Sequence, residues 1–203
     1  AAVELAKGWL QEAGYADGSE LGTITIMHNT SEAHAQIAQA IQAMWREVLN
    51  IDVVKPAGAQ PGGFIQVDLK DTGEVYDAFG QFNPEGVCHI AANPSPSGFP
   101  RQQTFQNNVM STYNVMQAAG DSGARRLIYA SSEMATGWLT TDALPQQFPF
   151  NEEDRVASPN AYALSKYLGE VIADSMVLRY PQMSICSLRI NNIILPDRYD
   201  TLK

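Results

Sequence analysis

Tyr162 and Lys166 are the two residues in this chain whose side-chain types and spacing most clearly suit acid–base catalysis. They stand four residues apart in the stretch YALSK, inside a segment with helical spacing, so both side chains lie on one helix face. A phenol with an ordinary pKa of about 10 is a poor acid–base catalyst at neutral pH, but a nearby ammonium favours the phenolate and lowers that pKa. The same spacing is also typical of a solvated helix surface. The pair therefore needs support from other parts of the sequence.

The elements that must position this pair alternate along the chain. Apolar patterning predicts strands over 23–27, 51–54, 64–69, 87–92, 125–132 and 184–190. It predicts helices over 2–13, 30–49, 73–79, 103–119 and 160–180, with an irregular loop over 136–159. This alternation predicts an α/β fold, a Rossmann-like doubly wound and mostly parallel sheet with helices on both faces. We expect a single domain over 1–203.

Two expectations concern side chains inside these elements. The helix over 103–119 is expected to bury an apolar stripe, which comprises Phe105, Val109, Tyr113 and Met116. Cys88 and Cys186 both fall in apolar strands. Neither has a His or Cys at ligand spacing, so we interpret them as small core residues rather than as a disulfide or a metal site.

Composition narrows the classes of function. The chain has 203 residues, 45% of them hydrophobic, and a net charge of −9, which is typical of a folded globular protein. No segment forms a basic face, so nucleic acid is not an expected partner. No apolar run approaches the roughly 20 residues that span a bilayer, and the first residues lack the pattern of a signal peptide. We expect a soluble, cytoplasmic chain without a membrane partner.

Six motifs support the Tyr–Lys pair because of their order and separation. They are DLKD at 68–71, HIAA at 89–92, NNVMSTYNVMQAA at 107–119, LIYASSEMATG at 127–137, YALSK at 162–166 and SLRINNIILP at 187–196. In this order they resemble the extended short-chain dehydrogenase/reductase family, which includes NAD-dependent sugar-nucleotide epimerases and dehydratases. The resemblance covers residues from about 56 to 203.

This resemblance implies catalytic roles for four residues. Tyr162 is expected to be the acid/base, and Lys166 to lower its pKa and hold the nicotinamide ribose. Ser132 is expected to bind and polarise the substrate oxygen, and Asn108 to support the lysine through water. The resemblance assigns no metal ligand.

The resemblance also implies a cofactor, NAD or NADP. Asp68 is expected to bind the adenine amino group. Ala91 and Ala92 are expected to form the strand end that passes close to the cofactor.

The chain departs from the family pattern at three places. Thr136 stands where a tyrosine is frequent, and Leu195 where a glycine precedes the proline. The chain stops at PDRYDTLK, before the segment that forms most of the sugar-nucleotide pocket in this family. A hydrophobic surface left exposed there could be covered by a homodimer or by strand exchange.

The first strand–helix–strand unit lacks the glycines that a dinucleotide site uses. Glycines let the backbone approach the pyrophosphate at the start of the first helix, but the sequence there is HNTSEAH, which includes Glu32. After the second strand, where an acidic residue usually binds the ribose hydroxyls, the chain has Lys55. A lysine suits a 2′-phosphate, although a solvated surface lysine explains it more simply.

Residues 1 to about 55 have a resemblance of their own. The segments EAGYADG, NTSEAH and AQAIQAMW resemble an internal part of the periplasmic oligopeptide/dipeptide-binding proteins. Taken together, the two resemblances imply a chimera, in which a fragment of a binding protein replaces the first strand–helix–strand of a dehydrogenase.

Three hypotheses for function follow from the sequence. The preferred one is a folded chimera, engineered or recombined, without native enzyme activity. The second is an NAD(P)-dependent epimerase, dehydratase or dehydrogenase with residual cofactor binding, and the third is a peptide-binding module. Cofactor titration separates the first two.

Overall fold

The structure is a computed structural model that describes residues 24–27, 48–55, 63–138, 151–152 and 158–191. The helix expected over 2–13 lies outside these residues, as does most of the helix expected over 30–49 and most of the loop expected over 136–159.

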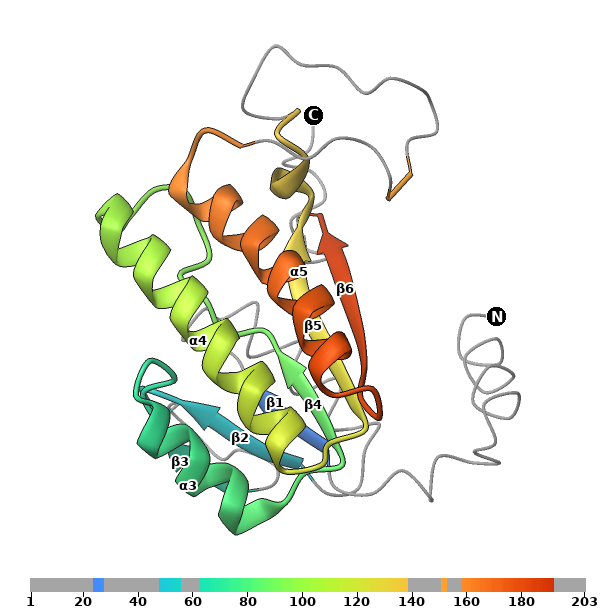
Figure 1. The fold of residues 1–203 in the computed structure, drawn as a ribbon. Helices are drawn as coiled ribbons and strands as arrows, with labels where there is room; N and C mark the ends of the chain where they lie inside the picture. The colour runs from blue at the N-terminus through green and yellow to red at the C-terminus, as the bar shows by residue number, and fades with distance from the viewer. Residues whose placement is uncertain (1–23, 28–47, 56–62, 139–150, 153–157, 192–203) are drawn as a thin grey trace, which may run out of the picture.

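A six-stranded parallel sheet forms the centre of the described fold (Figure 1). Its strands are β1 (Ile24–Met27), β2 (Val48–Asp52), β3 (Gly63–Gln66), β4 (Gly86–His89), β5 (Arg126–Ser132) and β6 (Ser184–Ile190). They pair in the order β3-β2-β1-β4-β5-β6, and every pair is parallel. This is the strand order of a Rossmann fold, so the predicted fold class is confirmed. All carboxyl ends of the strands therefore lie at one edge.

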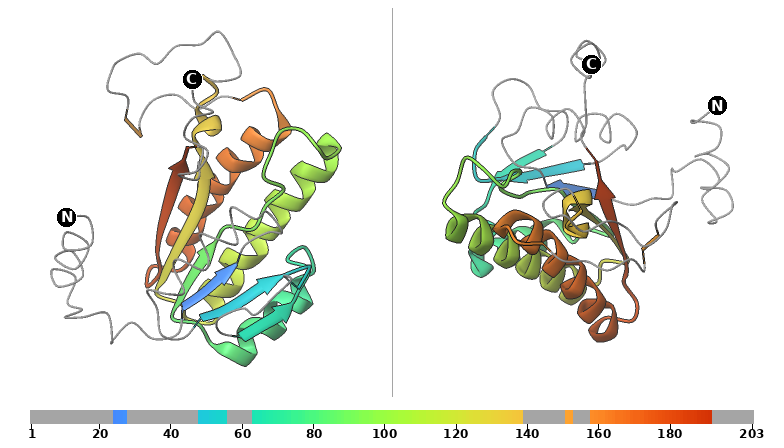
Figure 2. Two further views of the ribbon diagram at one scale, coloured as in Figure 1. Left: turned by 180° about the vertical axis from the view of Figure 1, so that it is seen from behind. Right: turned by 90° about the horizontal axis from the view of Figure 1, so that it is seen from above.

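Three helices cover one face of this sheet (Figure 2). They are α3 (Thr72–Phe82), α4 (Arg101–Asp121) and α5 (Ala161–Arg179), with a short 3-10 helix, η1 (Glu133–Thr136), directly after β5. Asp71 and Asn160 cap α3 and α5, because each side chain accepts a backbone N–H from the first turn. The N-cap of α5 thus lies two residues before Tyr162.

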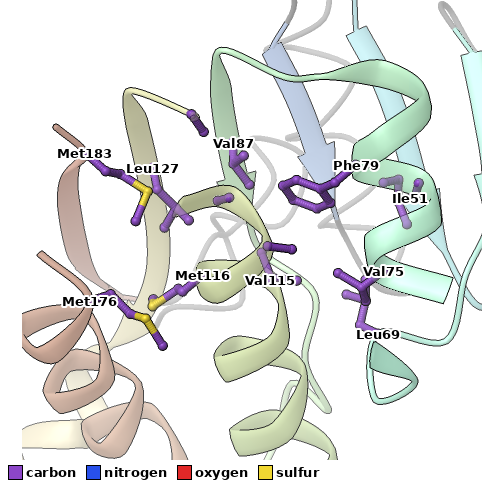
Figure 3. Packing of buried hydrophobic residues seen from close by; sticks show 14 of the residues in the cluster. Ile51, Leu69, Val75, Phe79, Val87, Val115, Met116, Leu127, Met176 and Met183 are labelled. Carbon is purple, nitrogen blue, oxygen red and sulfur yellow. The ribbon is translucent and has the colours of Figure 1, made fainter. Parts of the chain in front are cut away.

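The hydrophobic core lies between these helices and the sheet (Figure 3). Residues from β2, β4, β5 and all three helices contribute to it; they include Ile51, Val75, Phe79, Val87, Val115, Met116, Leu127 and Met176. Burial of this apolar surface is the main favourable term in holding α4 and α5 against the strands.

The bounds of β2 differ from the prediction. The strand begins at Val48, so the helix predicted through Leu49 is too long, and it ends at Asp52 rather than at residue 54. All five of its residues are buried, as expected for a central parallel strand, which shows no alternation. Val53 and Val54, predicted inside the strand, are 47% and 52% exposed.

Cys186 is exposed, so its prediction as a core residue is wrong, whereas Cys88 is buried as predicted. The reason is the position of β6 at the edge of the sheet. Alternate residues of β6 are exposed there, beginning with Ser184.

The stripe predicted for α4 is only partly buried. Met116 is buried, but Phe105 and Tyr113 are 37% and 39% exposed. The buried face of the helix instead carries small polar side chains, which include Thr104, Asn108, Ser111 and Thr112. Asn108 and Thr112 bond to Asn93 and His89, at or after the end of β4, so apolar spacing does not locate this face.

None of the helices in the described part combines the length and the apolar character needed to cross a membrane.

Two helical glycines give opposite predictions for the same substitution. A Cβ at Gly169 in α5 would overlap the ring and hydroxyl of Tyr129, whereas a Cβ at Gly80 in α3 would meet nothing within 4 Å. We expect Gly169→Ala to lower the free energy of unfolding by about 1–3 kcal/mol through overpacking. Gly80→Ala should raise it by about 0.5–1 kcal/mol through helix propensity. Urea unfolding measures both, and equal effects would contradict the close contact at Gly169.

Candidate active site

Tyr162 and Ser132 meet at the carboxyl edge of the sheet. Ser132 is the last residue of β5, and Tyr162 lies in the first turn of α5. The Ser132 hydroxyl lowers the pKa of the Tyr162 phenol, so the two groups interact. Both are largely buried, with 9% of Tyr162 and 6% of Ser132 exposed. The sequence-predicted phenol and hydroxyl are therefore together.

Lys166 lies one helical turn after Tyr162 and is 4% exposed. Its Nζ donates a hydrogen bond to the carbonyl oxygen of Ala130 at 2.6 Å. The same Nζ lies 5.3 Å from the ring centroid of Tyr129 and 5.9 Å from that of Tyr162. Both distances fall in the range of cation–π attraction. Burial lowers the pKa of Lys166 to about 8, because desolvation disfavours the ammonium.

The pKa of Tyr162 differs from the expectation. Burial raises the pKa of Tyr162 above its ordinary value, and the nearby Ser132 hydroxyl opposes that rise. The predicted lowering of this pKa by Lys166 is wrong for the chain alone: only burial and Ser132 shift it, and the Lys166 ammonium donates to the Ala130 carbonyl. In the chain alone the phenol is therefore the favoured form of Tyr162 at neutral pH.

A second layer of polar side chains lies behind Lys166. The Nε2 of His89 lies 3.1 Å from the hydroxyl of Thr112, and the imidazole stacks on the ring of Tyr129 with centroids 5.8 Å apart. Tyr129 donates to the backbone oxygen of Lys166 at 3.5 Å. Burial, and then the charge of Lys166, lower the pKa of His89 to about 3, so the imidazole is neutral. This layer was not predicted from the sequence, because each of its members has the appearance of an ordinary core residue.

Asn108 makes direct hydrogen bonds to Asn93 and Ser165, whereas a link through water to Lys166 was expected. Its Nδ2 donates to the carbonyl of Asn93 at 3.2 Å and to the hydroxyl of Ser165 at 3.0 Å. Its Oδ1 accepts the Asn93 N–H at 2.7 Å. The side chain thus fastens the segment that follows β4 to α5. Its support of Lys166 through water stays a prediction.

A pocket of about 540 Å³ opens at the same edge, where β2, β3 and β4 end. Its lining includes Asp68, Ala91 and Ala92, the three residues predicted to contact the cofactor, together with Lys70 from the β3 end and Asn107 from α4. Asp68 is partly exposed and pairs with Lys70 at 3.4 Å. The volume lies within the usual range for small-molecule sites, about 300–1,000 Å³.

Asp52 also lines this pocket, although it was not predicted from the sequence. It is 4% exposed and its Oδ1 accepts the backbone N–H of Val54 at 3.2 Å. The predicted strand ran through residue 54, which placed Lys55 first after it. The true end of β2 makes Asp52 the acidic residue at the strand terminus, and Lys55 is exposed.

The positions that depart from the family pattern are only partly described. Thr136 is 5% exposed and donates to the carbonyl of Glu133 at 2.7 Å, which closes η1 on itself. Glu32 and Leu195 lie outside the described residues. Among the described residues, no group of three or more His, Cys, Asp or Glu is placed to hold a metal ion.

The parallel order with β1 in the middle, and polar groups gathered where the strands end, define a Rossmann-fold protein. At this edge Lys166 lies over the ring of Tyr162. The model of the NAD dependent epimerase/dehydratase family matches residues 22–202. The chain belongs to that family. The match begins before residue 56, so it also includes the whole predicted strand–helix–strand segment over 23–54, which resembles the binding proteins.

Individual relatives support both resemblances. UDP-glucose 4-epimerase of Mycoplasma pneumoniae is 28% identical over 130 residues, which are 63% of this chain and 37% of that protein. The oligopeptide-binding protein OppA of Bacillus subtilis is 49% identical over 49 residues, 24% of this chain and 9% of that protein. The chain thus spans well under half of the curated epimerase.

A solved structure shows the same fold. The UDP-glucose 4-epimerase of Thermus thermophilus in complex with NAD aligns with a TM-score of 0.69 at 22% identity. The alignment covers 82% of this chain and 54% of that one.

The buried imidazole predicts a defined loss of stability in acid. The pKa of His89 is lowered from 6.5 to about 3, so between these values the unfolded chain binds a proton that the folded chain does not. Stability therefore falls as the pH drops below about 6.5, by up to about 1.4 kcal/mol per pH unit. His89→Gln should remove this part of the slope while keeping a polar group toward Thr112. Urea unfolding at pH 7, 6, 5 and 4 measures the difference, and parallel curves would contradict the buried neutral imidazole.

Proposed function

We propose that this chain binds NAD in the pocket at the ends of β2, β3 and β4, and that it carries the acid–base site of an oxidoreductase. The observation that carries the proposal is the meeting of Ser132, Tyr162 and Lys166 at the edge that also holds this pocket. If the Tyr–Lys spacing belonged only to a solvated helix surface, the lysine would not be buried beside two tyrosine rings.

The residues present suit the adenosine half of the cofactor. Two carboxylates, Asp52 and Asp68, line the pocket from neighbouring strand ends and can accept hydrogen bonds from ribose hydroxyls and an adenine amino group. The buried carboxylate of Asp52 also disfavours a 2′-phosphate at that position, which favours NAD over NADP. The segment that would hold the pyrophosphate lies outside the described residues.

The acid–base residues suit a carbinol substrate. NAD supplies a hydride acceptor when bound. Tyr162 would take the hydroxyl proton and return it in the reverse direction, and Ser132 would hold the substrate oxygen. Lys166, still protonated at pH 7, would hold a positive charge beside the phenol as the phenolate forms. UDP-glucose appears in the names of several relatives, so a sugar nucleotide is the substrate class we propose.

Calorimetric titration tests cofactor binding directly. We expect NAD to bind more tightly than NADP. Asp52→Asn should weaken NAD about tenfold or more, because a hydrogen bond to a charged acceptor contributes about 1.5–3 kcal/mol. The matched control is Asp77→Asn, which removes an exposed carboxylate from α3 and should change neither affinity. Absence of heat at millimolar NAD, in a chain shown to be folded, would overturn the proposal.

A second candidate is a folded chimera that binds cofactor too weakly to catalyse. The observation that favours it is the 49% identity to an oligopeptide-binding protein over 49 residues, far above the 28% identity to the Mycoplasma pneumoniae epimerase. No glycine occurs between Gly22 and Gly58, so the segment lacks the turn that lets a backbone approach a pyrophosphate.

Restoring that turn separates the two candidates. Replacement of HNTSEAH, residues 28–34, by a glycine-rich turn of equal length should raise NAD affinity if the described pocket binds adenosine. The same titration measures the gain in NAD affinity. As a control, D52N in the variant with the glycine-rich turn should reduce that gain. No gain in a folded variant would show that Asp52 and Asp68 do not form a cofactor site.

A further inference from the structure

Glu170 is held by two strands at once. Its Oε1 accepts a hydrogen bond from the hydroxyl of Ser131 in β5 at 2.5 Å. Arg189 in β6 donates to both carboxylate oxygens, from Nε at 3.0 Å and from Nη2 at 2.9 Å. The side chains of Arg189 and Glu170 are only 22% and 15% exposed. This arrangement is a forked, charge-assisted contact, which is the stronger kind of hydrogen bond.

The two strand residues are neighbours in the sheet. Ser131 pairs with Arg189 in the register of β5 and β6, so both side chains reach the same face, the one that α5 covers. The Glu170 carboxylate on α5 thus lies between the side chains of Ser131 and Arg189 on adjacent strands. Any slide of α5 along β5 would break all three hydrogen bonds together.

Glu170 also shares a helix face with the acid–base pair. Tyr162, Lys166 and Glu170 follow one another at intervals of four residues, and Glu170 lies about 12 Å along the axis from Tyr162. Ser131 immediately precedes Ser132, the last residue of β5, whose hydroxyl interacts with Tyr162. Glu170 therefore fastens α5 to β5 one residue before Ser132.

We infer that Glu170 is a positioning residue of the acid–base site, which acts by holding α5 in one register over β5 and β6 so that Tyr162 meets Ser132. The catalytic part of this inference rests on the proposed function, but the geometric part does not. Neither Glu170 nor Arg189 needs to touch substrate or cofactor for this role.

The chain offers a matched control at the opposite end of α5. Asp121, the last residue of α4, accepts hydrogen bonds from the hydroxyls of Tyr76 and Tyr180. It therefore also fastens α5 through a carboxylate. Tyr180 is eighteen residues after Tyr162, about 27 Å along the axis. Asp121→Asn should weaken the packing of α5 without changing its register at the active edge.

The experiment reads the environment of Tyr162 by 19F NMR of the full chain labelled with 3-fluorotyrosine. The chain has eight tyrosines, and Tyr162→Phe identifies the resonance of interest. Ser132→Ala defines the shift that follows loss of the Ser132–Tyr162 contact. We expect Glu170→Gln to move the Tyr162 resonance toward its S132A position, and D121N to leave it in place. If E170Q does not fold, as judged by far-UV circular dichroism, Ser131→Ala removes one of the three hydrogen bonds and should give a smaller shift of the same sign.

An unchanged Tyr162 resonance in folded E170Q, together with a moved one in S132A, would overturn the inference. This measurement needs neither cofactor nor turnover, so it remains readable if the proposed function fails. Where turnover is measurable, E170Q should lower kcat about 10- to 100-fold with a smaller change in KM. The loss should disappear in the Y162F background, because Glu170 acts through Tyr162. An equal loss in both backgrounds would indicate a purely structural role.

Discussion

The buried ammonium of Lys166 constrains how α5 and β5 are arranged around it. A charge removed from water is costly unless it is paired or hydrogen-bonded, and here the partners are the Ala130 carbonyl and the faces of two tyrosine rings. These partners come from β5 and from α5, so Lys166 is tolerated only if helix and strand keep one relative position. The neutral His89 behind Tyr129 belongs to the same constraint, because a second positive charge there would oppose the first.

Much of the fold could be predicted from the sequence, because its periodic elements are long. The five strands after residue 48 and the three described helices all fall where patterning predicted them, within a few residues. The errors have physical causes. β2 is buried throughout and shows no alternation to mark its ends, and α4 packs with threonine, serine and asparagine toward the strand ends. The edge position of β6 depends on the whole sheet order, so the exposure of Cys186 could not be predicted locally.

The part of the candidate site that lies within sequence motifs could be predicted from the sequence. Ser132, Tyr162 and Lys166 meet because YASS ends a strand and YALSK begins a helix that packs beside it. Asp52 was missed because its place in the pocket lining depends on where β2 stops. Glu170 and Arg189 were missed because their partnership depends on the register of β5 and β6, which no local pattern contains.

Asp52 also shows how strand pairing determines which side chains line the pocket. It belongs to the stretch that resembles oligopeptide-binding proteins, whereas Asp68 belongs to the stretch with the dehydrogenase motifs, yet both line one pocket. Parallel pairing explains this convergence, because any strand accepted between β3 and β1 must deliver its carboxyl end to the same edge. A side chain at that end reaches the pocket whatever the origin of its strand. A backbone turn for a pyrophosphate depends instead on particular glycines, so topology alone cannot supply it.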